Sequence, residues 1–308
     1  AYHAMLRWVT ASPQNRNILV YSLYLPYMQA VAQIRRRFPD VRATVIVTDL
    51  PNELGIASGR RGLLKSIEYR MGAQRIALCS AFDGFVLLAA AMAEALPIAG
   101  KASMVLEGLV SDQPMIVDEA PVLPHDDRPA VLYTGTLNRE LGIDILLDAF
   151  AGYDQAQLWL CGRGNMQQRV AEAAALHSHI RYFGLVPQQT ALALQTRATA
   201  LINPRTAQGT FTRYSFPSKT LEYMRSGTPV LCCKLEGIPN TYDPYLTYIA
   251  PQTAEGIRAA VQALVARTPQ ERRAMGERAR DFVLREKNAR AQCARLAGFM
   301  RGLHGIME

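Results

Sequence analysis

The chain has 308 residues, of which 49% are hydrophobic and 19% charged, and its formal net charge is +8. This length is sufficient for two globular domains with separate cores. No apolar run approaches the roughly 18 residues of a membrane-spanning helix, so the composition argues against an integral helical membrane protein.

The N-terminus lacks the basic and then apolar segment of a secretory signal. The five cysteines are scattered and lie mostly in apolar runs, and no pair has metal-ligand spacing. This usage is typical of reduced thiols in a cytoplasmic protein, so we expect a cytoplasmic location and no metal site.

Basic residues gather in two segments. Residues 267–301 hold ten Arg or Lys against four Asp or Glu, and residues 60–75 are also basic. No known nucleic-acid-binding motif accompanies them. They favour a peripheral contact with an anionic membrane surface, and the alternative is a set of solvated helix faces.

Strand-like apolar runs alternate with helical patterns through the first part of the chain. The predicted strands are 18–22, 44–48, 76–79 and 103–107, and the predicted helices are 27–38, 62–71 and 84–95. This alternation is typical of βαβ units, which form parallel sheets flanked by helices.

The second part continues the alternation. The predicted strands are 130–133, 157–161, 180–183, 200–203, 230–233 and 247–249. The predicted helices are 141–151, 166–176, 188–196 and 218–226, with a helical tail from about 253. The sequence therefore predicts an α/β protein with two Rossmann-like domains.

A segment rich in proline and acidic residues divides the two parts. We expect a first domain over 1–115, a linker over 116–128, a second domain over 129–285 and a C-terminal helix over 286–308 that crosses back to the first domain. The first part has few strands and begins at Ala1, so we expect that the first domain is incomplete.

The most informative segment begins at Ser218, where a loop leads into a short helix that Gly227 is suited to end. The unpaired N–H groups at a helix start attract anions, and Lys219 stands beside them. Glu222 lies one turn past Ser218. N–H groups and a cation suit a phosphate, and a carboxylate suits a vicinal diol, so this pattern predicts a nucleotide-sugar site.

Glycine-containing turns follow several strands of the second part, at Gly135, Gly162, Gly164 and Gly184. In doubly wound domains ligands bind where strands end and helices begin. Glycine lets the backbone approach a ligand closely, so these turns predict one crevice lined for a nucleotide.

The second part resembles the donor domain of GT-B-fold glycosyltransferases, in particular the retaining family 4 enzymes. The matching segments are 133–136, 142–147, 160–164, 182–186 and 221–230. Residues 47–51 and 105–110 resemble the later part of the family's acceptor domain. The family's glycine-rich first loop is missing, in line with an incomplete first domain.

The resemblance implies roles for individual residues. Glu222 is the carboxylate expected to hold the donor ribose, and the segment from Phe216 to Lys219 is expected to face the phosphates and the sugar. The turn around Phe183–Val186 corresponds to the base-binding turn. The expected donor-binding residues are Gly135, Thr136, Arg139, Gly162, Gly164, Phe183, Gly184, Val186, Tyr214, Ser215, Phe216, Ser218, Lys219 and Glu222.

The chain departs from the family at three positions. Tyr214 stands where the family often has a Glu that contacts the sugar, and Thr136 and Leu141 stand where it has diphosphate-binding cations. Arg139, Arg205 and Lys219 are near enough in sequence to substitute. We expect Lys219 and Arg205 to stabilise the leaving group catalytically, without a metal cofactor.

Asp49 follows a predicted strand of the first part. A carboxylate there could accept the proton of the acceptor hydroxyl, so Asp49 is a candidate catalytic base. Capping of a helix is the alternative role.

Together these features predict a retaining glycosyltransferase. It would move a hexose from a nucleotide diphosphate sugar to a hydroxyl acceptor, in bacterial surface polysaccharide or glycolipid assembly. Two alternatives remain: a nucleotide-sugar epimerase with a GT-B-like cleft, and a non-catalytic nucleotide-sugar-binding protein.

Overall fold

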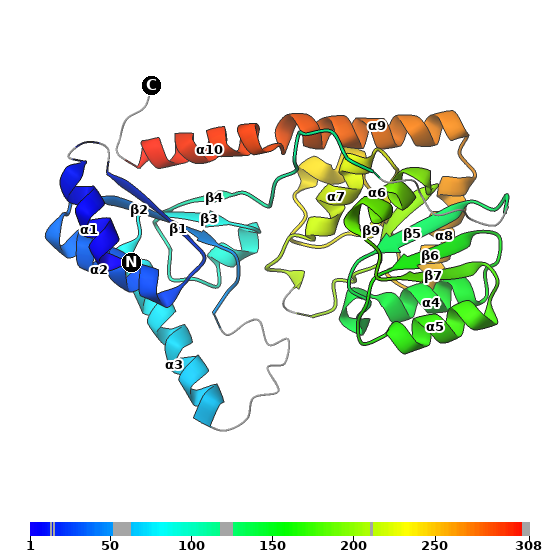
Figure 1. Ribbon diagram of the computed structural model, residues 1–308, viewed down its shortest axis with the longest axis horizontal. Helices are drawn as coiled ribbons and strands as arrows, with labels where there is room; N and C mark the ends of the chain where they lie inside the picture. The colour runs from blue at the N-terminus through cyan, green and yellow to red at the C-terminus, as the bar shows by residue number, and fades with distance from the viewer. Residues whose placement is uncertain (13, 15, 52–62, 118–125, 210–211, 304–308) are drawn as a thin grey trace. The chain divides into compact units, whose positions relative to one another are not determined.

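The computed structural model describes residues 1–12, 14, 16–51, 63–117, 126–209 and 212–303. The chain forms two compact units. Unit 1 comprises Ala1–Gly108, Gly209–Phe216 and Gln292–Glu308, and unit 2 comprises Leu109–Gln208 and Pro217–Ala291. Each unit contains one parallel sheet, as the alternating pattern predicted (Figure 1).

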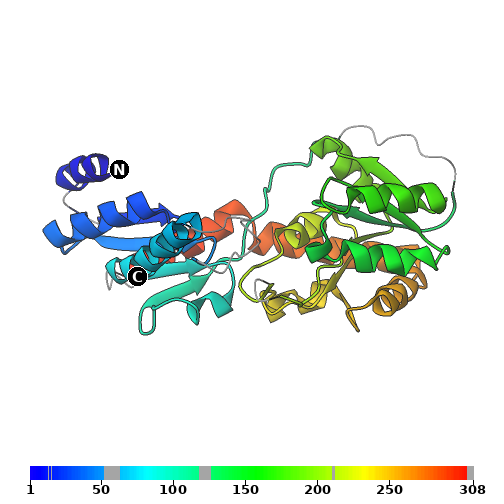
Figure 2. The same ribbon diagram turned by 90° about the horizontal axis from the view of Figure 1, so that it is seen from below.

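Unit 1 is built on a four-stranded sheet of order β1-β2-β3-β4. Its strands are β1 (Asn17–Tyr21), β2 (Arg42–Val47), β3 (Gly84–Leu87) and β4 (Ala102–Val105). Its helices are α1 (Tyr2–Ala11), α2 (Leu25–Arg37) and α3 (Leu63–Leu78), the short 3-10 helices η1 (Cys79–Ala81) and η2 (Ala90–Ala93), and α10 (Ala289–Gly302) from Gln292 onward. Helix α1 packs against α2 (Figure 2).

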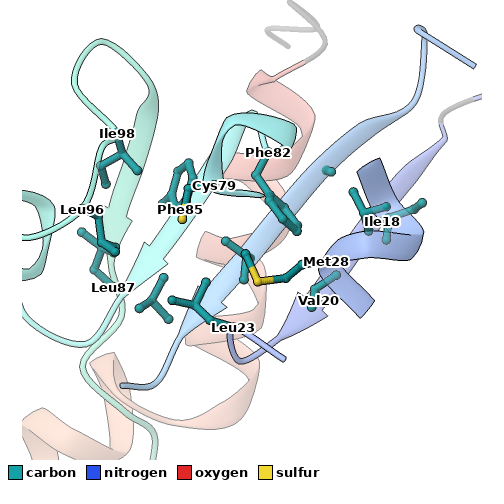
Figure 3. Packing of buried hydrophobic residues seen from close by; sticks show 14 of the residues in the cluster. Ile18, Val20, Leu23, Met28, Cys79, Phe82, Phe85, Leu87, Leu96 and Ile98 are labelled. Carbon is teal, nitrogen blue, oxygen red and sulfur yellow. The ribbon is translucent and has the colours of Figure 1, made fainter. Parts of the chain in front are cut away.

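The core of unit 1 gathers apolar side chains from the sheet and from α2. Figure 3 shows Ile18 and Val20 of β1, Met28 of α2, and Phe85 and Leu87 of β3, all of them buried in one cluster. Gly84 of β3 lies against α10, since a Cβ added there would stand 2.9 Å from the Phe299 ring. Both faces of β3 are therefore covered.

The sequence prediction was wrong at two places in unit 1. Residues 76–79, predicted as a strand, form the end of α3 and the start of η1, and residues 84–95, predicted as a helix, contain β3 and η2. The alanines at 89–91 favoured the helix prediction, but 84–87 is buried on both sides in the middle of the sheet. Short apolar runs of this kind fit either structure by periodicity, and tertiary burial decides between them.

Unit 2 is built on a six-stranded parallel sheet of order β10-β9-β8-β5-β6-β7. Its strands are β5 (Ala130–Thr134), β6 (Gln157–Cys161), β7 (Ile180–Gly184), β8 (Ala200–Asn203), β9 (Val230–Cys233) and β10 (Thr247–Ile249). Each agrees with the sequence prediction to within one residue. Apolar runs bounded by turn residues made these strands easy to recognise.

Helices join these strands. They are α4 (Ile143–Ala151), α5 (Gln167–Leu176), α6 (Gln188–Arg197), α7 (Ser218–Ser226), α8 (Ala254–Val265) and α9 (Pro269–Glu286), with 3-10 helices η3 (Arg139–Leu141) and η5 (Asn240–Tyr245). Helix α4 contacts α5 and α8, whereas α7 contacts α6 and α9 (Figure 1). None of the helices in the described ranges is long and apolar enough to cross a membrane.

The structure divides the chain differently from the sequence at several segments. Residues 109–115, expected in the first domain, and residues 286–291, expected in the C-terminal helix, group with unit 2. Residues 209–216, expected in the second domain, group with unit 1. Tyr214 packs against the core of unit 1, and Arg213 donates to Glu94 at 2.6 Å. Most of the predicted linker, 118–125, lies outside the described residues.

Candidate functional site

The strand order of unit 2 reverses between β5 and β8. The chain enters the sheet at β5, proceeds through β6 to β7, and then crosses to β8 on the other side of β5. In open parallel sheets, ligands bind beyond the carboxyl ends of the strands at such a switch point. The site is therefore expected where the loops after β5, β6 and β8 meet the start of α7.

The loops that follow β5 and β6 are joined by backbone and side-chain hydrogen bonds. Gly135 N donates to Cys161 O at 2.9 Å, in the first residue after β5. Asn138 Oδ1 accepts from Asn165 N at 2.9 Å, and Asn165 Oδ1 accepts from Arg139 N at 3.1 Å. This reciprocal pair holds the two loops together.

The glycines of these loops have a structural reason beyond access for a ligand. A Cβ at Gly162 would lie 1.8 Å from Gly135 O, and a Cβ at Gly164 would lie 2.3 Å from Leu137 O. Gly162 also has a φ of +136° and donates its N–H to Gly184 O at 2.8 Å. The glycines therefore allow the two loops to pack backbone to backbone, and these loops form the carboxyl edge of the sheet where a ligand would bind.

Helix α7 starts at this edge. Pro217 is its N-cap residue, with Thr220 N donating to Pro217 O at 2.8 Å, and Gly227 ends the helix with a φ of +79°. The side chain of Ser218, the first helical residue, is exposed. The first N–H groups of a helix have no partner within it, so this end of α7 suits an anion.

Lys219 and Glu222 form an ion pair on α7. Lys219 Nζ lies 3.0 Å from Glu222 Oε2 and 3.2 Å from Oε1, and the two side chains are 40% and 33% exposed. From the sequence we expected separate partners for them, phosphate and ribose, and did not predict that they pair with each other. They are neighbours because positions i and i+3 share a helix face.

Arg205 directly follows β8 and is half-buried. Burial lowers the pKa of its guanidinium, and the nearby Tyr133 partly offsets that effect. The Tyr133 hydroxyl donates to Thr136 O at 2.8 Å. The structure thus brings Arg205 close to the loop after β5, where Gly135 lies within reach of the Lys219 side chain.

The predicted base-binding turn lies at the end of β7. Phe183 and Val186 are half-buried, and Gly184 has a φ of +69°. Phe183 meets the Trp159 ring edge-on at 6.2 Å between centroids, and the Tyr182 hydroxyl donates to Gly162 O at 2.9 Å. These contacts tie the turn to the loop after β6.

The remaining predicted residues are exposed or belong to unit 1. Arg139 is 63% exposed and pairs with Asp144 at 3.3 Å, and the side chain of Thr136 is exposed. Tyr214, Ser215 and Phe216 belong to unit 1. Tyr214 packs against the core there, so its ring has a clear structural role.

Asp49 also belongs to unit 1, just beyond the end of β2. Its side chain is exposed, it makes no hydrogen bond to any described residue, and the next described helix begins only at Leu63. Its expected role as a catalytic base stays a prediction.

A buried polar cluster contacts Glu222, and it was not predicted from the sequence. Gln195 of α6, fully buried, donates from Nε2 to Glu222 Oε1 at 2.8 Å and to Thr134 Oγ1 at 3.1 Å. Tyr223 Oη accepts from Thr134 N at 2.8 Å and donates to Thr134 O at 3.0 Å. The available signal was slight, because Gln195 directly follows the apolar run 191–194 of α6 and precedes further polar residues.

Metal-ligand groups are absent from the described ranges: no three His, Cys, Asp or Glu side chains there are placed to hold an ion. His179 is buried, with Nε2 2.8 Å from Phe150 O.

Comparison with known proteins shows which family the segment that holds this site resembles. Residues 128–267 match the family model of glycosyl transferases group 1. A phosphatidyl-myo-inositol mannosyltransferase of Mycobacterium leprae (strain TN) is 32% identical over 111 residues, 34% of this chain. That match spans only 28% of the length of the mycobacterial protein.

Two solved structures share the fold across almost the whole chain. Sucrose-phosphate synthase from Thermosynechococcus elongatus has a TM-score of 0.69 and 18% identity, with 99% of this chain and 77% of that one covered. The HepE protein of Anabaena in complex with UDP has a TM-score of 0.67 and 13% identity, with 98% and 82% covered. The chain therefore has the two Rossmann-like units of the GT-B fold class and resembles family 4 glycosyltransferases, with residues 128–267 matching the model of glycosyl transferases group 1.

Proposed function

We propose that this protein is a retaining glycosyltransferase that moves a hexose from a nucleotide diphosphate sugar to a hydroxyl acceptor. The observation that carries the proposal is the placement of Lys219 and Glu222 at the start of α7, beside the switch point between β5 and β8. A cation, helix N–H groups and a carboxylate there match the phosphates and the diol of one donor.

Each part of the donor has a matching group in unit 2. The diphosphate would bind the start of α7 with Lys219 and Arg205, and the ribose hydroxyls would bind Glu222. The base would contact the turn Phe183–Val186, in which the Phe183 ring packs edge-on against Trp159. The family match over 128–267 covers all of these residues, which supports reading them as one donor site.

In the proposed reaction the bond between the sugar C1 and the diphosphate oxygen breaks, and the acceptor oxygen bonds to C1. Negative charge gathers on the departing diphosphate, and Lys219 and Arg205 would stabilise it there. The proton of the acceptor hydroxyl would pass to a base, for which Asp49 is the candidate. The cations take the role that a metal ion has in other phosphate chemistry, so we expect activity without added metal.

We further propose that the acceptor is a lipid-linked intermediate in bacterial surface polysaccharide or glycolipid assembly, met at the inner face of the plasma membrane. The mannosyltransferase relative is named for a lipid acceptor, phosphatidyl-myo-inositol. Helix α3 exposes Ile67, Tyr69 and Met71 together with Arg70. Apolar and basic side chains on one exposed helix suit an anionic membrane surface.

Co-sedimentation with vesicles of anionic or neutral lipid, at low and at high salt, tests the membrane proposal. Binding should require anionic lipid and weaken as salt screens the charges. Binding that ignores both lipid charge and salt would refute it. Arg70→Glu should weaken binding, whereas the same change at the exposed Arg197 of α6 should not.

Donor binding followed by a nucleotide-release assay tests the activity. Calorimetry with UDP, GDP and ADP, each with its sugar conjugates, identifies the donor, and release of nucleoside diphosphate in the presence of an acceptor fraction reports transfer. A transferase releases diphosphate, an epimerase converts the donor sugar without acceptor, and a non-catalytic binder does neither. Either of the last two results would overturn the proposed transfer.

A further inference from the structure

Gln195 stands directly behind the carboxylate that the proposed function assigns to the donor ribose. It lies in α6, is fully buried, and donates from Nε2 to Glu222 Oε1 at 2.8 Å and to Thr134 Oγ1 at 3.1 Å. The amide thus connects the end of β5, the helix α6 and the functional helix α7.

The orientation of this amide is fixed by its neighbours. An ionised carboxylate only accepts hydrogen bonds, so the Nε2 end must face Glu222. Thr134 Oγ1, the second acceptor of Nε2, lies 3.4 Å from the hydroxyl of Tyr223. Tyr223 in turn holds the backbone of Thr134 through both its N–H and its carbonyl. Both amide protons therefore have assigned partners.

The environment of Gln195 Oε1, the other end of the amide, indicates that this residue is present for its polar group. Gln195 Oε1 is buried and has no hydrogen-bond partner among the residues that the structure describes. A buried acceptor without a partner destabilises the folded state. An unbranched apolar side chain would fill the same space without that cost, so packing alone does not explain a glutamine here.

The fold has a second use for this residue, but it involves only the backbone. Thr228 Oγ1 donates to Gln195 O at 2.7 Å. This bond survives any side-chain substitution. A change at Gln195 therefore affects only what its amide does for Glu222 and Thr134.

The hydrogen-bond capacity of Glu222 separates the roles of its two partners. Among the residues that the structure describes, Oε1 accepts from both Gln195 and Lys219, whereas Oε2 accepts from Lys219 alone. Lys219 is 40% exposed at the helix start and can turn to a phosphate, which would release one acceptor site on each oxygen. Gln195 is buried and cannot leave, so it would hold the carboxylate plane while a diol binds the released sites.

We propose that Gln195 is a positioning residue that fixes the Glu222 carboxylate for the ribose diol of the donor. This inference rests on the proposed function, because it requires that Glu222 bind the ribose. It assigns to a buried amide of α6 a part in distinguishing ligands with a ribose diol from ligands without one.

The test is a ratio of affinities. The dissociation constant is measured for the tightest binder of UDP, GDP and ADP and for its 2′,3′-dideoxy counterpart, with inorganic pyrophosphate as a third probe. Hydrogen bonds to a charged group correspond to a wild-type preference for the diol of about 10- to 100-fold. The diphosphate is common to both nucleotides, so its own protonation cancels in the ratio.

Gln195→Met should reduce this preference by about fivefold or more while leaving pyrophosphate affinity unchanged. The matched control is Gln157→Met, the same substitution at a buried glutamine of β6 at the opposite edge of the sheet. It should lower the melting temperature and leave the preference at the wild-type value.

Gln195→Glu adds a readout that a purely structural role would not produce. The introduced carboxyl can donate to Glu222 only while it holds a proton, and two ionised carboxylates at this distance repel each other. The preference for the diol should therefore be near the wild-type value at pH 5 and should fall by pH 8, and this variant answers the question even if Gln195→Met does not fold.

The outcomes distinguish the two levels of the proposal. A wild-type protein that binds the dideoxy nucleotide as tightly as the ribonucleotide would overturn the role of Glu222 in the proposed function. A wild-type preference that persists in Gln195→Met, or one that does not change with pH in Gln195→Glu, would overturn the role of Gln195 alone.

Discussion

The amino edge and the carboxyl edge of the sheet in unit 2 have the same kinds of side chain, but these side chains have different roles. At the amino edge, Asp126 accepts from Arg128 at 2.8 Å and lies 3.6 Å from Arg181. Gln157 there donates to Arg128 O at 2.9 Å and accepts from Trp159 and Arg181. The carboxylate, the cations and both ends of the glutamine are thus engaged with one another.

The carboxyl edge also has a carboxylate, a cation and a buried glutamine, but the set is left open. Lys219 and Glu222 are partly exposed, and the N–H groups at the start of α7 face outward from the helix. A closed network stabilises the fold, whereas an open one retains capacity for a ligand. The two edges contain the same residue types. What distinguishes the site from the scaffold is whether the hydrogen-bonding groups are already satisfied within the protein.

The largest expected effect is on stability, and it differs between two glycines, one at each edge of the sheet. Gly162→Ala, at the carboxyl edge, should lower the free energy of unfolding by about 3 kcal/mol, because its Cβ would meet Gly135 O and its φ is unfavourable for alanine. Gly152→Ala follows α4 at the amino edge, where nothing lies within 4 Å of the added Cβ. Its effect should be within about 0.5 kcal/mol.

Urea denaturation measures both glycine variants. A Gly162→Ala protein as stable as the wild type would show that the loops after β5 and β6 are not packed backbone to backbone. Gly162 would then be needed, if at all, only for access of a ligand.

The next effect concerns the closed network. Hydrogen bonds from Arg128, together with the charges of Arg128 and Arg181, hold the pKa of Asp126 at about 2, against a usual value of 3.8. Stability from this depressed pKa is fully present above about pH 4 and is lost as the pH falls toward 2. Asp126→Asn should therefore lower the free energy of unfolding by about 2 kcal/mol at pH 7.

The difference between wild type and Asp126→Asn should shrink as the pH falls through about 2, and nucleotide affinity should not change. Denaturant titrations across this pH range provide the check. A loss of nucleotide binding in this variant would break the comparison, because it would show that the amino edge is also part of the site.

The smallest expected effect concerns the open network. Lys219→Met should weaken binding of a nucleoside diphosphate by about tenfold. It should leave the bare nucleoside unaffected or bound slightly more tightly, because the lysine no longer competes for Glu222. Lys234→Met is the control, since Lys234 directly follows β9 and is held by Asp243 and Tyr248.

Calorimetric titration with diphosphate and with nucleoside measures the Lys219 and Lys234 variants. Equal losses for the two ligands in Lys219→Met would indicate that the lysine only supports the helix. If Lys234→Met lost as much diphosphate affinity as Lys219→Met, the distinction between Lys234, held within the fold, and Lys219, available to a ligand, would be wrong.

The sequence was sufficient for much of this architecture. Each strand of the second sheet lies between turn residues, so its apolar run could be assigned with little ambiguity. In unit 1 the run at 84–87 stands beside alanines and was mistaken for part of a helix, because only the burial of β3 on both faces identifies it as a strand. Local pattern succeeded where the boundaries were marked in the sequence itself.

The site shows the same limit. Ser218, Lys219 and Glu222 could be placed from the helix start alone, because their spacing lies within one element. Gln195 comes from α6, 27 residues earlier, and only the packing of α6 against α7 and β5 brings its amide to Glu222. Similarly, the contact of Gly162 with Gly135 O depends on two loops that are distant in sequence.

The central claim is that Glu222 binds the donor nucleotide, and calorimetry on Glu222→Ala tests it most directly. Glu222→Ala should lower the affinity for both nucleoside and diphosphate by about 10- to 100-fold, because charge-assisted hydrogen bonds are lost. Glu277→Ala, at an exposed glutamate of α9, should bind both ligands like the wild type. A Glu222→Ala protein that binds nucleoside and diphosphate with wild-type affinity would contradict the account.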